Sequence, residues 1–353
     1  MKKITRLVLT VFLSFMMLTG LTGCGDSDRE TLRVFNWGVY IDPAVIVMFE
    51  EEFNVRVIYE EYHSNEMMYT RLISGEVFDI LKPSDYMIER LISEGMIQPI
   101  DFSRIEGMDG IMPGLLNLPF DPYQQYSVPY FWGNVGLVFN RHNVPLELLE
   151  EQGWNILQNT DFAGRIYMYD SERDSFMVAL KALGFSQNTE DEHEIMLAYE
   201  WLVQVHETMN PEYVMDEVLD NMIAGRRDIA VVYSGCATWI IHENPDMDFF
   251  VPEAGTNLWV DAMVIMTDAP NPDMAHNWIN FMLRPEIARM NASYIGYTPV
   301  LQDIFDELGS PGGLFYGISS FTPRLDHPTD DMFRYNEPLR VRIAELWIRI
   351  LAR

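Results

Sequence analysis

Apolar and polar positions repeat with two different periods along the first hundred residues after position 30. Short runs rich in β-branched and aromatic residues predict strands at 31–37, 55–62 and 78–84. Apolar residues spaced three and four apart, with capping residues before them, predict helices at 42–53, 64–75 and 84–95. Strands that alternate with helices in this way are typical of a parallel sheet covered by helices.

The same two patterns continue through the rest of the chain. Further strands are predicted at 135–140, 164–170, 227–235 and 258–266. Helices are predicted at about 191–208, at 274–296 with an interruption at Pro285, and at 337–353. The strand that begins at residue 135 is where we expect the chain to cross for the first time from one lobe to another.

The N-terminal segment predicts a secretory leader rather than part of the fold. Lys2, Lys3 and Arg6 precede an apolar stretch at 7–18, which is too short to span a bilayer as a permanent helix. The sequence Leu-Thr-Gly-Cys at 21–24 resembles the lipobox of bacterial lipoproteins. We therefore expect residues 1–23 to be a signal peptide, Cys24 to carry lipid and 24–30 to form a tether. An ordinary signal peptide that happens to meet a cysteine is the competing interpretation.

Chain length predicts two lobes. Without residues 1–23 the chain has 330 of its 353 residues, which is more than one hydrophobic core usually serves. The expected lobes are 31–137 plus 259–305, and 138–258 plus 306–353.

Charge and cysteine content restrict the partners and the chemistry. The formal net charge is −29, and loss of the three basic residues of the leader makes it about −32, which disfavours nucleic acid as a partner. Cys236 is the only cysteine after Cys24, so the mature body cannot contain a disulfide framework. A lone cysteine such as Cys236 is more often a small packed side chain than a nucleophile.

Local signatures of enzymes are absent from the sequence. There is no HExxH, CxxC, GxSxG or P-loop pattern, and the 7 histidines are scattered. We therefore expect no metal, no cofactor and no catalytic activity. Paired carboxylates leave little trace in a sequence, so a secreted enzyme acting on a cationic substrate stays open as an alternative.

Asp261 is the residue that most needs an explanation. It lies in the apolar run "NLWVDAMVIM" (257–266), where a half-buried carboxylate requires a cation or several hydrogen-bond donors. Trp259 lies two residues earlier, on the same face of the predicted strand. Core packing is the competing interpretation for Trp259.

Other polar and aromatic side chains follow the predicted strands at the edge where ligands bind in open parallel sheets. They are Trp37, Tyr40, Ser84, Tyr86 and the acidic group at 170–174. Ser84 and Ser171 also fit helix N-caps. Aromatic faces combined with carboxylates suit ammonium groups separated by methylenes.

Seven stretches of the chain resemble the substrate-binding proteins of polyamine ABC transporters, the spermidine/putrescine-binding type. They are "VFNWGVYI", "YHSNEMMYTRL", "PSDYMIERL", "EGMIQPID", "PFDPYQQYSVPYFWG", "LWVDAMVI" and "INFMLRPEIA…YIGYTP", in family order from about 32 to 300. The resemblance implies an α/β, two-lobed periplasmic-binding-protein fold (type II-like), with the ligand cleft between lobes joined by crossing strands. It implies a monomeric extracytoplasmic receptor, lipid-anchored to the cell membrane, that captures spermidine or putrescine and delivers it to an ABC permease.

The resemblance also implies a set of ligand-binding residues. They are Trp37, Gly38, Tyr40, Ser84, Tyr86, Ser171, Asp174, Tyr233, Trp259, Asp261 and Tyr297. In this set Trp259 would stack on the methylene chain, Asp261 would pair with one amine and Asp174 with a terminal amine.

The sequence departs from the family pattern at four positions. Gly38 stands where some members have threonine, and Ser171 where some have a second acid. Lys82 would repel a polyamine if it faced the cleft, so we expect it to point away. Arg334 stands roughly where a neutral amide is expected. A receptor for another organic cation, or a sensor that reports polyamine without transport, therefore remain alternatives.

Overall fold

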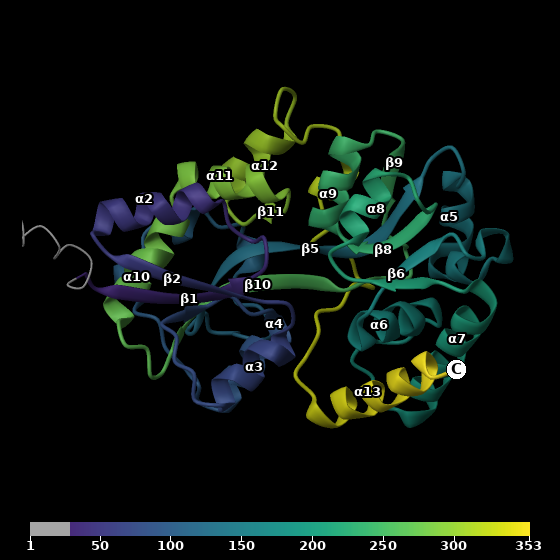
Figure 1. Cartoon of the computed structure of the whole chain (residues 1–353), viewed down its shortest axis with the longest axis horizontal. Helices are drawn as coiled ribbons and strands as arrows, with labels where there is room; N and C mark the ends of the chain where they lie inside the picture. The colour runs from purple at the N-terminus through teal and green to yellow at the C-terminus, as the bar shows by residue number, and fades with distance from the viewer. Residues whose placement is uncertain (1–28) are drawn as a thin grey trace, which may run out of the picture.

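The computed structural model describes residues 29–353, and it forms two α/β lobes that lie side by side (Figure 1). The predicted leader and Cys24 lie outside the described residues. Within residues 29–353, no helix has the length and apolar character needed to span a bilayer.

The first lobe is built on a sheet with the strand order β2-β1-β3-β10-β5. β1 is parallel to β2 and β3, whereas β10 is antiparallel to β3 and β5. Its strands are β1 (Thr31–Trp37), β2 (Arg56–Tyr62), β3 (Ile80–Leu81), β4 (Ile97–Gln98), β10 (Leu258–Met266), β11 (Thr298–Pro299) and the first half of β5 (Ser127–Asn140). Its helices are α2 (Pro43–Phe53), α3 (Asn65–Ile73), α4 (Asp85–Ser93), α10 (Pro272–Met282), α11 (Pro285–Ile295) and α12 (Gln302–Gly309).

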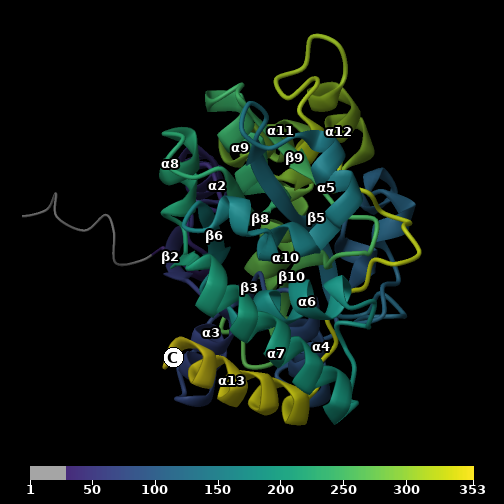
Figure 2. The same cartoon turned by 90° about the vertical axis from the view of Figure 1, so that its right-hand side faces the viewer.

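The second lobe has a smaller sheet in which the second half of β5 pairs with β8, β8 with β6, and β6 with β7. Its strands are β6 (Ile166–Tyr169), β7 (Glu212–Val214), β8 (Ile229–Tyr233) and β9 (Met247–Phe250). Its helices are α5 (Leu146–Gln152), α6 (Glu172–Ala182), α7 (Glu192–Met209), α8 (Val218–Ile223), α9 (Ser234–Glu243) and α13 (Glu337–Leu351). α13 lies against α7, as Figure 2 shows.

Short 3₁₀ turns connect several of these elements. They are Phe102–Arg104, Met108–Gly110, Pro113–Leu115, Gly153–Gln158, Thr160–Phe162 and Ser319–Phe321.

Most predicted elements are confirmed, and the boundaries follow local chemistry. Asp42 caps α2 by accepting from the backbone N–H of Ala44, and Pro43 follows at the first helical position. The predicted interruption at Pro285 is present, because α10 ends at Met282 and α11 begins at Pro285. The predicted C-terminal amphipathic helix is α13.

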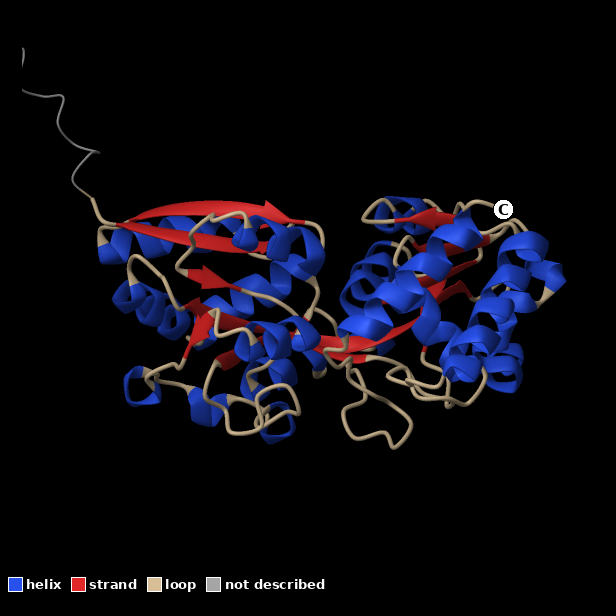
Figure 3. Ribbon diagram, turned by 90° about the horizontal axis from the view of Figure 1, so that it is seen from below, coloured by secondary structure: helices blue, strands red, loops and turns tan. Residues whose placement is uncertain are grey.

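One long strand, β5, belongs to both lobes. Residues 127–134 pair with β10, and residues 135–139 pair with β8. The strand therefore passes from one lobe into the other (Figure 3). A second connection enters β10 at Leu258, and the segment 331–336, which we call the C-terminal segment, makes a third before α13.

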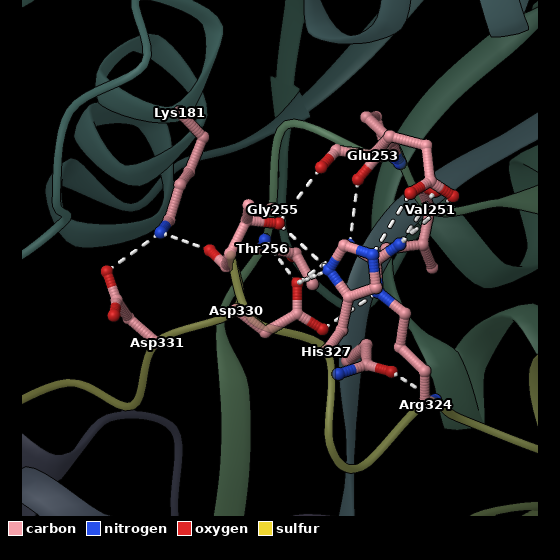
Figure 4. A network of polar contacts seen from close by, with 12 residues as sticks. Lys181, Val251, Glu253, Gly255, Thr256, Arg324, His327, Asp330 and Asp331 are labelled. Carbon is pink, nitrogen blue, oxygen red and sulfur yellow. Dashed lines mark hydrogen bonds and ion pairs between the residues drawn. The ribbon is translucent and has the colours of Figure 1, made fainter.

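A polar network joins all three of these connections (Figure 4). Arg324 donates two hydrogen bonds to the carboxylate of Asp330, at 2.7 and 2.8 Å, and that carboxylate also accepts from the N–H of Thr256. The hydroxyl of Thr256 donates to the carbonyl of Val135 at 2.6 Å. Lys181 of α6 reaches the same region and pairs with Asp331 at 2.7 Å. The network thus ties the loop before β10 to the C-terminal part of the chain and to β5.

We predict that Asp330→Ala lowers the free energy of unfolding by roughly 3 kcal/mol, because it leaves Arg324 without its buried partner. The Asp330 side chain is 2% exposed. Glu253 lies 3.9 Å from the same arginine but is 86% exposed, so Glu253→Ala should change the free energy by less than about 0.5 kcal/mol. Urea unfolding of both variants tests this, and equal losses would contradict the importance of the buried pair.

Candidate functional site

Asp261 lies at the first-lobe end of the predicted site, on β10. Its carboxylate accepts a hydrogen bond from the hydroxyl of Tyr40 at 2.7 Å through Oδ2, while Oδ1 is buried without a hydrogen-bond partner. The predicted half-burial of the Asp261 carboxylate is wrong, because Asp261 is only 6% exposed. Every residue of β10 is buried, because β10 lies inside the sheet between β3 and β5.

An irregularity in β10 brings Ser84 to Asp261. The pairing of β10 with β5 shifts register between Asp261 and Ala262. There the N–H of Ala262 donates instead to the carbonyl of Pro83, at 3.1 Å, and Ser84 forms an antiparallel bridge with Asp261. The start of α4 is thereby held against the carboxylate.

The environment of Asp261 raises its pKa from an ordinary value of 3.8 to about 6. Burial is the main cause, and hydrogen bonds from Ser84 and Tyr40 offset it only in part. A pKa of about 6 instead of 3.8 corresponds to roughly 3 kcal/mol of unfavourable free energy for the ionised folded form at neutral pH. A cation bound at the unpartnered Oδ1 atom would therefore lower the free energy of the folded protein substantially.

Aromatic rings form a continuous wall from Asp261 into the second lobe. The ring of Tyr40 lies 5.3 Å from that of Tyr297, and Tyr297 lies 5.5 Å from Trp259. Trp259 lies 6.1 Å from Tyr233, which comes from the end of β8. Each of these contacts is edge-to-face, which is a favourable arrangement for aromatic pairs.

Asp174 lies at the other end of this wall. Its carboxylate accepts from the hydroxyl of Tyr233 at 2.7 Å and from that of Ser171 at 2.8 Å. Asp174 is 5% exposed, and burial raises its pKa. Ser171 also accepts from the N–H of Asp174 as the N-cap of α6, so the predicted cap is confirmed.

Three predicted residues lie beside this wall rather than in it. The ring of Trp37 packs 4.7 Å from that of Tyr62, and the N–H of Gly38 donates to the carbonyl of Tyr62 at 3.2 Å. Tyr86 lies on α4, where its hydroxyl donates to Glu66 at 3.2 Å.

Sequence reasoning missed Asp85, which follows Ser84 at the start of α4. Its side chain is buried and its Oδ2 atom has no hydrogen-bond partner. Burial raises its pKa well above the ordinary value, and the charge of Asp261 adds to this. The stretch "PSDY" contained the signal, an acid next to two residues already singled out.

Two further residues near the wall were also missed as site residues. The ring of Tyr169 stacks on Tyr233 at 4.8 Å, and the thiol of Cys236 lies 3.3 Å from the hydroxyl of Tyr297. Burial raises the pKa of Cys236, which keeps the thiol protonated, in agreement with a packed side chain.

The two unexpected basic residues have partners of their own. Lys82 is buried with its Nζ atom 3.7 Å from the ring centroid of Tyr130 and 5.7 Å from that of Trp278, and burial lowers its pKa well below the ordinary value. Arg334 is exposed and forms an ion pair with Glu89 of α4.

Two glycines make room for the aromatic wall. A Cβ atom on Gly133 would lie 2.7 Å from the Trp259 ring, and one on Gly235 would lie 2.2 Å from the Tyr297 ring. Side chains at these positions would displace the rings. Among residues 29–353, no group of three or more His, Cys, Asp or Glu side chains has the arrangement of a metal site.

The geometry defines a class of protein. Two α/β lobes joined by crossing strands, with buried acids and aromatic rings where they meet, form a solute-binding protein with an interlobe site. Residues 75–309 match the family model described as "Bacterial extracellular solute-binding protein", and residues 1–109 match one described as "Hypothetical lipoprotein (MG045 family)".

Curated relatives and solved structures agree with that match. The chain is 33% identical over 285 residues to the spermidine/putrescine-binding periplasmic proteins of Salmonella typhimurium and Escherichia coli, covering 80% of this chain and 81% of each relative. A putative spermidine/putrescine ABC transporter structure from Listeria monocytogenes aligns with TM-score 0.82 and 33% identity, over 91% of this chain and 98% of that one.

The spermidine/putrescine ABC transporter substrate-binding protein PotD of Streptococcus pneumoniae aligns with TM-score 0.78 and 32% identity, over 92% and 99% of the two chains. The chain therefore belongs to the bacterial extracellular solute-binding protein family. The expected two-lobed fold is confirmed, and the family consists of extracytoplasmic transport proteins rather than enzymes.

We predict that Asp261→Asn stabilises the unliganded protein at pH 8 by up to roughly 3 kcal/mol. The folded pKa is raised, so the stability that the protonated carboxyl contributes is present below pH 4 and is lost as the pH rises through about 6. The difference between variant and parent should therefore vanish near pH 4. Thermal unfolding across this range tests it. Asp273→Asn, at an acid whose side chain is 79% exposed, is the control, and a pH-independent difference for Asp261→Asn would contradict the prediction.

We predict that Gly235→Ala destabilises the protein by about 1–3 kcal/mol, because the new methyl group meets the Tyr297 ring. The sign of the change in unfolding free energy is informative, since alanine normally stabilises a helix relative to glycine by about 1 kcal/mol. Gly38→Ala is the control for a glycine with room for a methyl group, because its Cβ atom would lie 3.7 Å from His63, an ordinary contact. Gly38 lies in a turn, so the helix contribution does not apply to it. Urea unfolding and near-ultraviolet circular dichroism measure both, and a stabilised Gly235→Ala variant would refute the close approach.

Proposed function

We propose that this protein captures a polyamine, spermidine or putrescine, between its lobes and delivers it to an ABC permease. The observation that carries the proposal is the pair of buried acids, Asp261 and Asp174, at opposite ends of one aromatic wall. The relatives that are 33% identical are spermidine/putrescine-binding periplasmic proteins, which supports the same ligand class.

The proposed ligand matches the wall in charge and in shape. A protonated amine at Asp261 Oδ1 would supply the missing partner of that buried atom and remove most of its cost. The methylenes of the ligand would lie on Trp259 and Tyr297. Burial of their apolar surface would favour binding, and the two aromatic rings would attract the adjacent ammonium groups. A second amine would pair with Asp174, whose carboxylate is already oriented by Tyr233 and Ser171.

The proposed contacts explain how binding and lobe closure are coupled. Asp261 and Tyr40 come from the first lobe, whereas Asp174 and Tyr233 come from the second. A diamine or triamine that pairs with both acids therefore favours the closed arrangement. We place one lobe boundary near 134/135, where β5 changes its partner from β10 to β8, and a second near 257/258, where β10 begins. We place a third after α12, which continues past the expected boundary at 305 to residue 309.

The proposal extends to the membrane. A lipid on Cys24 would hold the body at the cell membrane next to the permease, with residues 24–30 as the tether. The family match at residues 1–109 supports a lipoprotein. We also propose that the protein acts as a monomer, because one chain contributes every residue of the site.

A sensor or a receptor for another organic cation would use the same contacts. Competition binding separates a polyamine from another cation. Recovery of the bound polyamine chemically unchanged would exclude turnover by an enzyme. Dependence of polyamine uptake on this protein together with its permease separates transport from sensing.

We predict one-to-one binding of spermidine or putrescine by isothermal titration calorimetry, with an affinity that falls about 100-fold in Asp261→Asn and in Asp174→Asn. Asp273→Asn, whose side chain lies on the exposed surface, should bind as the parent does. The absence of heat and of any thermal shift with spermidine, putrescine and spermine would refute the polyamine ligand. Unchanged affinity in Asp261→Asn would refute the proposed site.

A further inference from the structure

Arg173 reaches across the interface between the lobes. It is the second residue of α6 in the second lobe, next to Asp174. Its guanidinium carbon lies 3.7 Å from the ring centroid of Tyr86 on α4 and 5.3 Å from that of Phe333 in the C-terminal segment. The helices α4 and α6 lie on the two sides of this segment in Figure 1.

The surroundings of Arg173 resemble a cation-binding site that is occupied by the protein's own guanidinium group. Nη2 lies 3.7 Å from Glu66 Oε1, and the hydroxyl of Tyr86 donates to the same carboxylate oxygen at 3.2 Å. The Arg173 side chain is 14% exposed, so its contact with Tyr86 is largely shielded from water. An aromatic face beside a carboxylate is the same chemistry that Tyr40, Trp259 and Asp261 offer to a ligand.

Tyr86, Phe333 and Glu66 surround the guanidinium of Arg173, and we call them the Arg173 pocket. The pocket lies at the Asp174 end of the wall. Arg173 precedes Asp174 in the chain, and charges on Arg173 and on Glu66 both act on the Asp174 carboxyl. The face of Tyr86, which sequence reasoning assigned to the ligand, is covered by the guanidinium of the protein itself. A ligand amine beyond Asp174 would meet a fixed positive charge and a filled aromatic face.

We propose that Arg173 is a specificity-determining residue that ends the ligand site at Asp174. The inference rests on the proposed polyamine function. Polyamines whose last amine reaches Asp174 are accepted, and longer ones are disfavoured because an ammonium group that extends beyond Asp174 would meet the guanidinium of Arg173. The Arg173 pocket, formed by Tyr86, Phe333 and Glu66, becomes a third cation site when the guanidinium is removed.

The test is the ratio of two dissociation constants in one protein. Arg173 also links the lobes, so its loss changes the free energy of closure for every ligand, but this common term cancels in the ratio of spermine to spermidine affinity. In Arg173→Ala we expect this ratio to shift towards spermine by about tenfold. Agmatine, which carries a guanidinium group, should gain relative to putrescine in the same variant.

Arg334→Ala is the matched control. Arg334 also joins the C-terminal segment to α4, through Glu89, but it lies on the exposed outer side. Its loss should leave the ratio unchanged. Arg173→Lys keeps the charge without the planar group, so its ratio should shift part of the way, and this variant provides the test if Arg173→Ala does not fold.

The outcomes separate the two proposals. If the parent protein binds none of the polyamines, the proposed function fails. If the parent binds and the ratio in folded Arg173→Ala or Arg173→Lys equals that of the parent, only the role of Arg173 is refuted. A shift of similar size in Arg334→Ala would also refute it, because the effect would then come from closure and not from the pocket.

Discussion

The cost of burying the Asp261 carboxylate is the constraint on which the rest of the site depends. β10 is covered on both faces, so the charge has no access to bulk water, and Tyr40 and Ser84 supply only part of the missing hydration. An apolar side chain there would pack well and remove this cost. A carboxylate in its place makes the folded protein less stable by itself and more responsive to a cation.

The crossing strands connect the buried Asp261 carboxylate to the relative position of the two lobes. β5 carries the first lobe's sheet into the second, and β10 holds Trp259 and Asp261 on the same wall. A ligand that binds at the wall, as we propose, would therefore act on the relative position of the lobes as well as on one side chain. The network of Arg324, Asp330 and Thr256 holds the chain beside these strands.

Three basic side chains near the acids have three different environments. Lys82 is buried against Tyr130 and Trp278, where burial favours its neutral form. Arg334 is exposed and paired with Glu89. Arg173 is enclosed and lies on Tyr86. In a site for cations, each arrangement keeps an internal positive charge off the wall between Asp261 and Asp174 or places it at the end of that wall.

The sequence by itself determined the order of the elements, because strand and helix periods and caps such as Asp42 are local properties. With the family resemblance it also located both acids and the aromatic residues between them. It did not predict the full burial of β10, the unpartnered oxygen of Asp85 or the contact of Arg173 with Tyr86. Each of these features depends on residues that are far apart in the chain. The burial of a strand, for example, depends on the elements that cover it rather than on its own residues. Tertiary structure alone decided which of the candidate side chains share one wall and that Arg173 lies on the face of Tyr86.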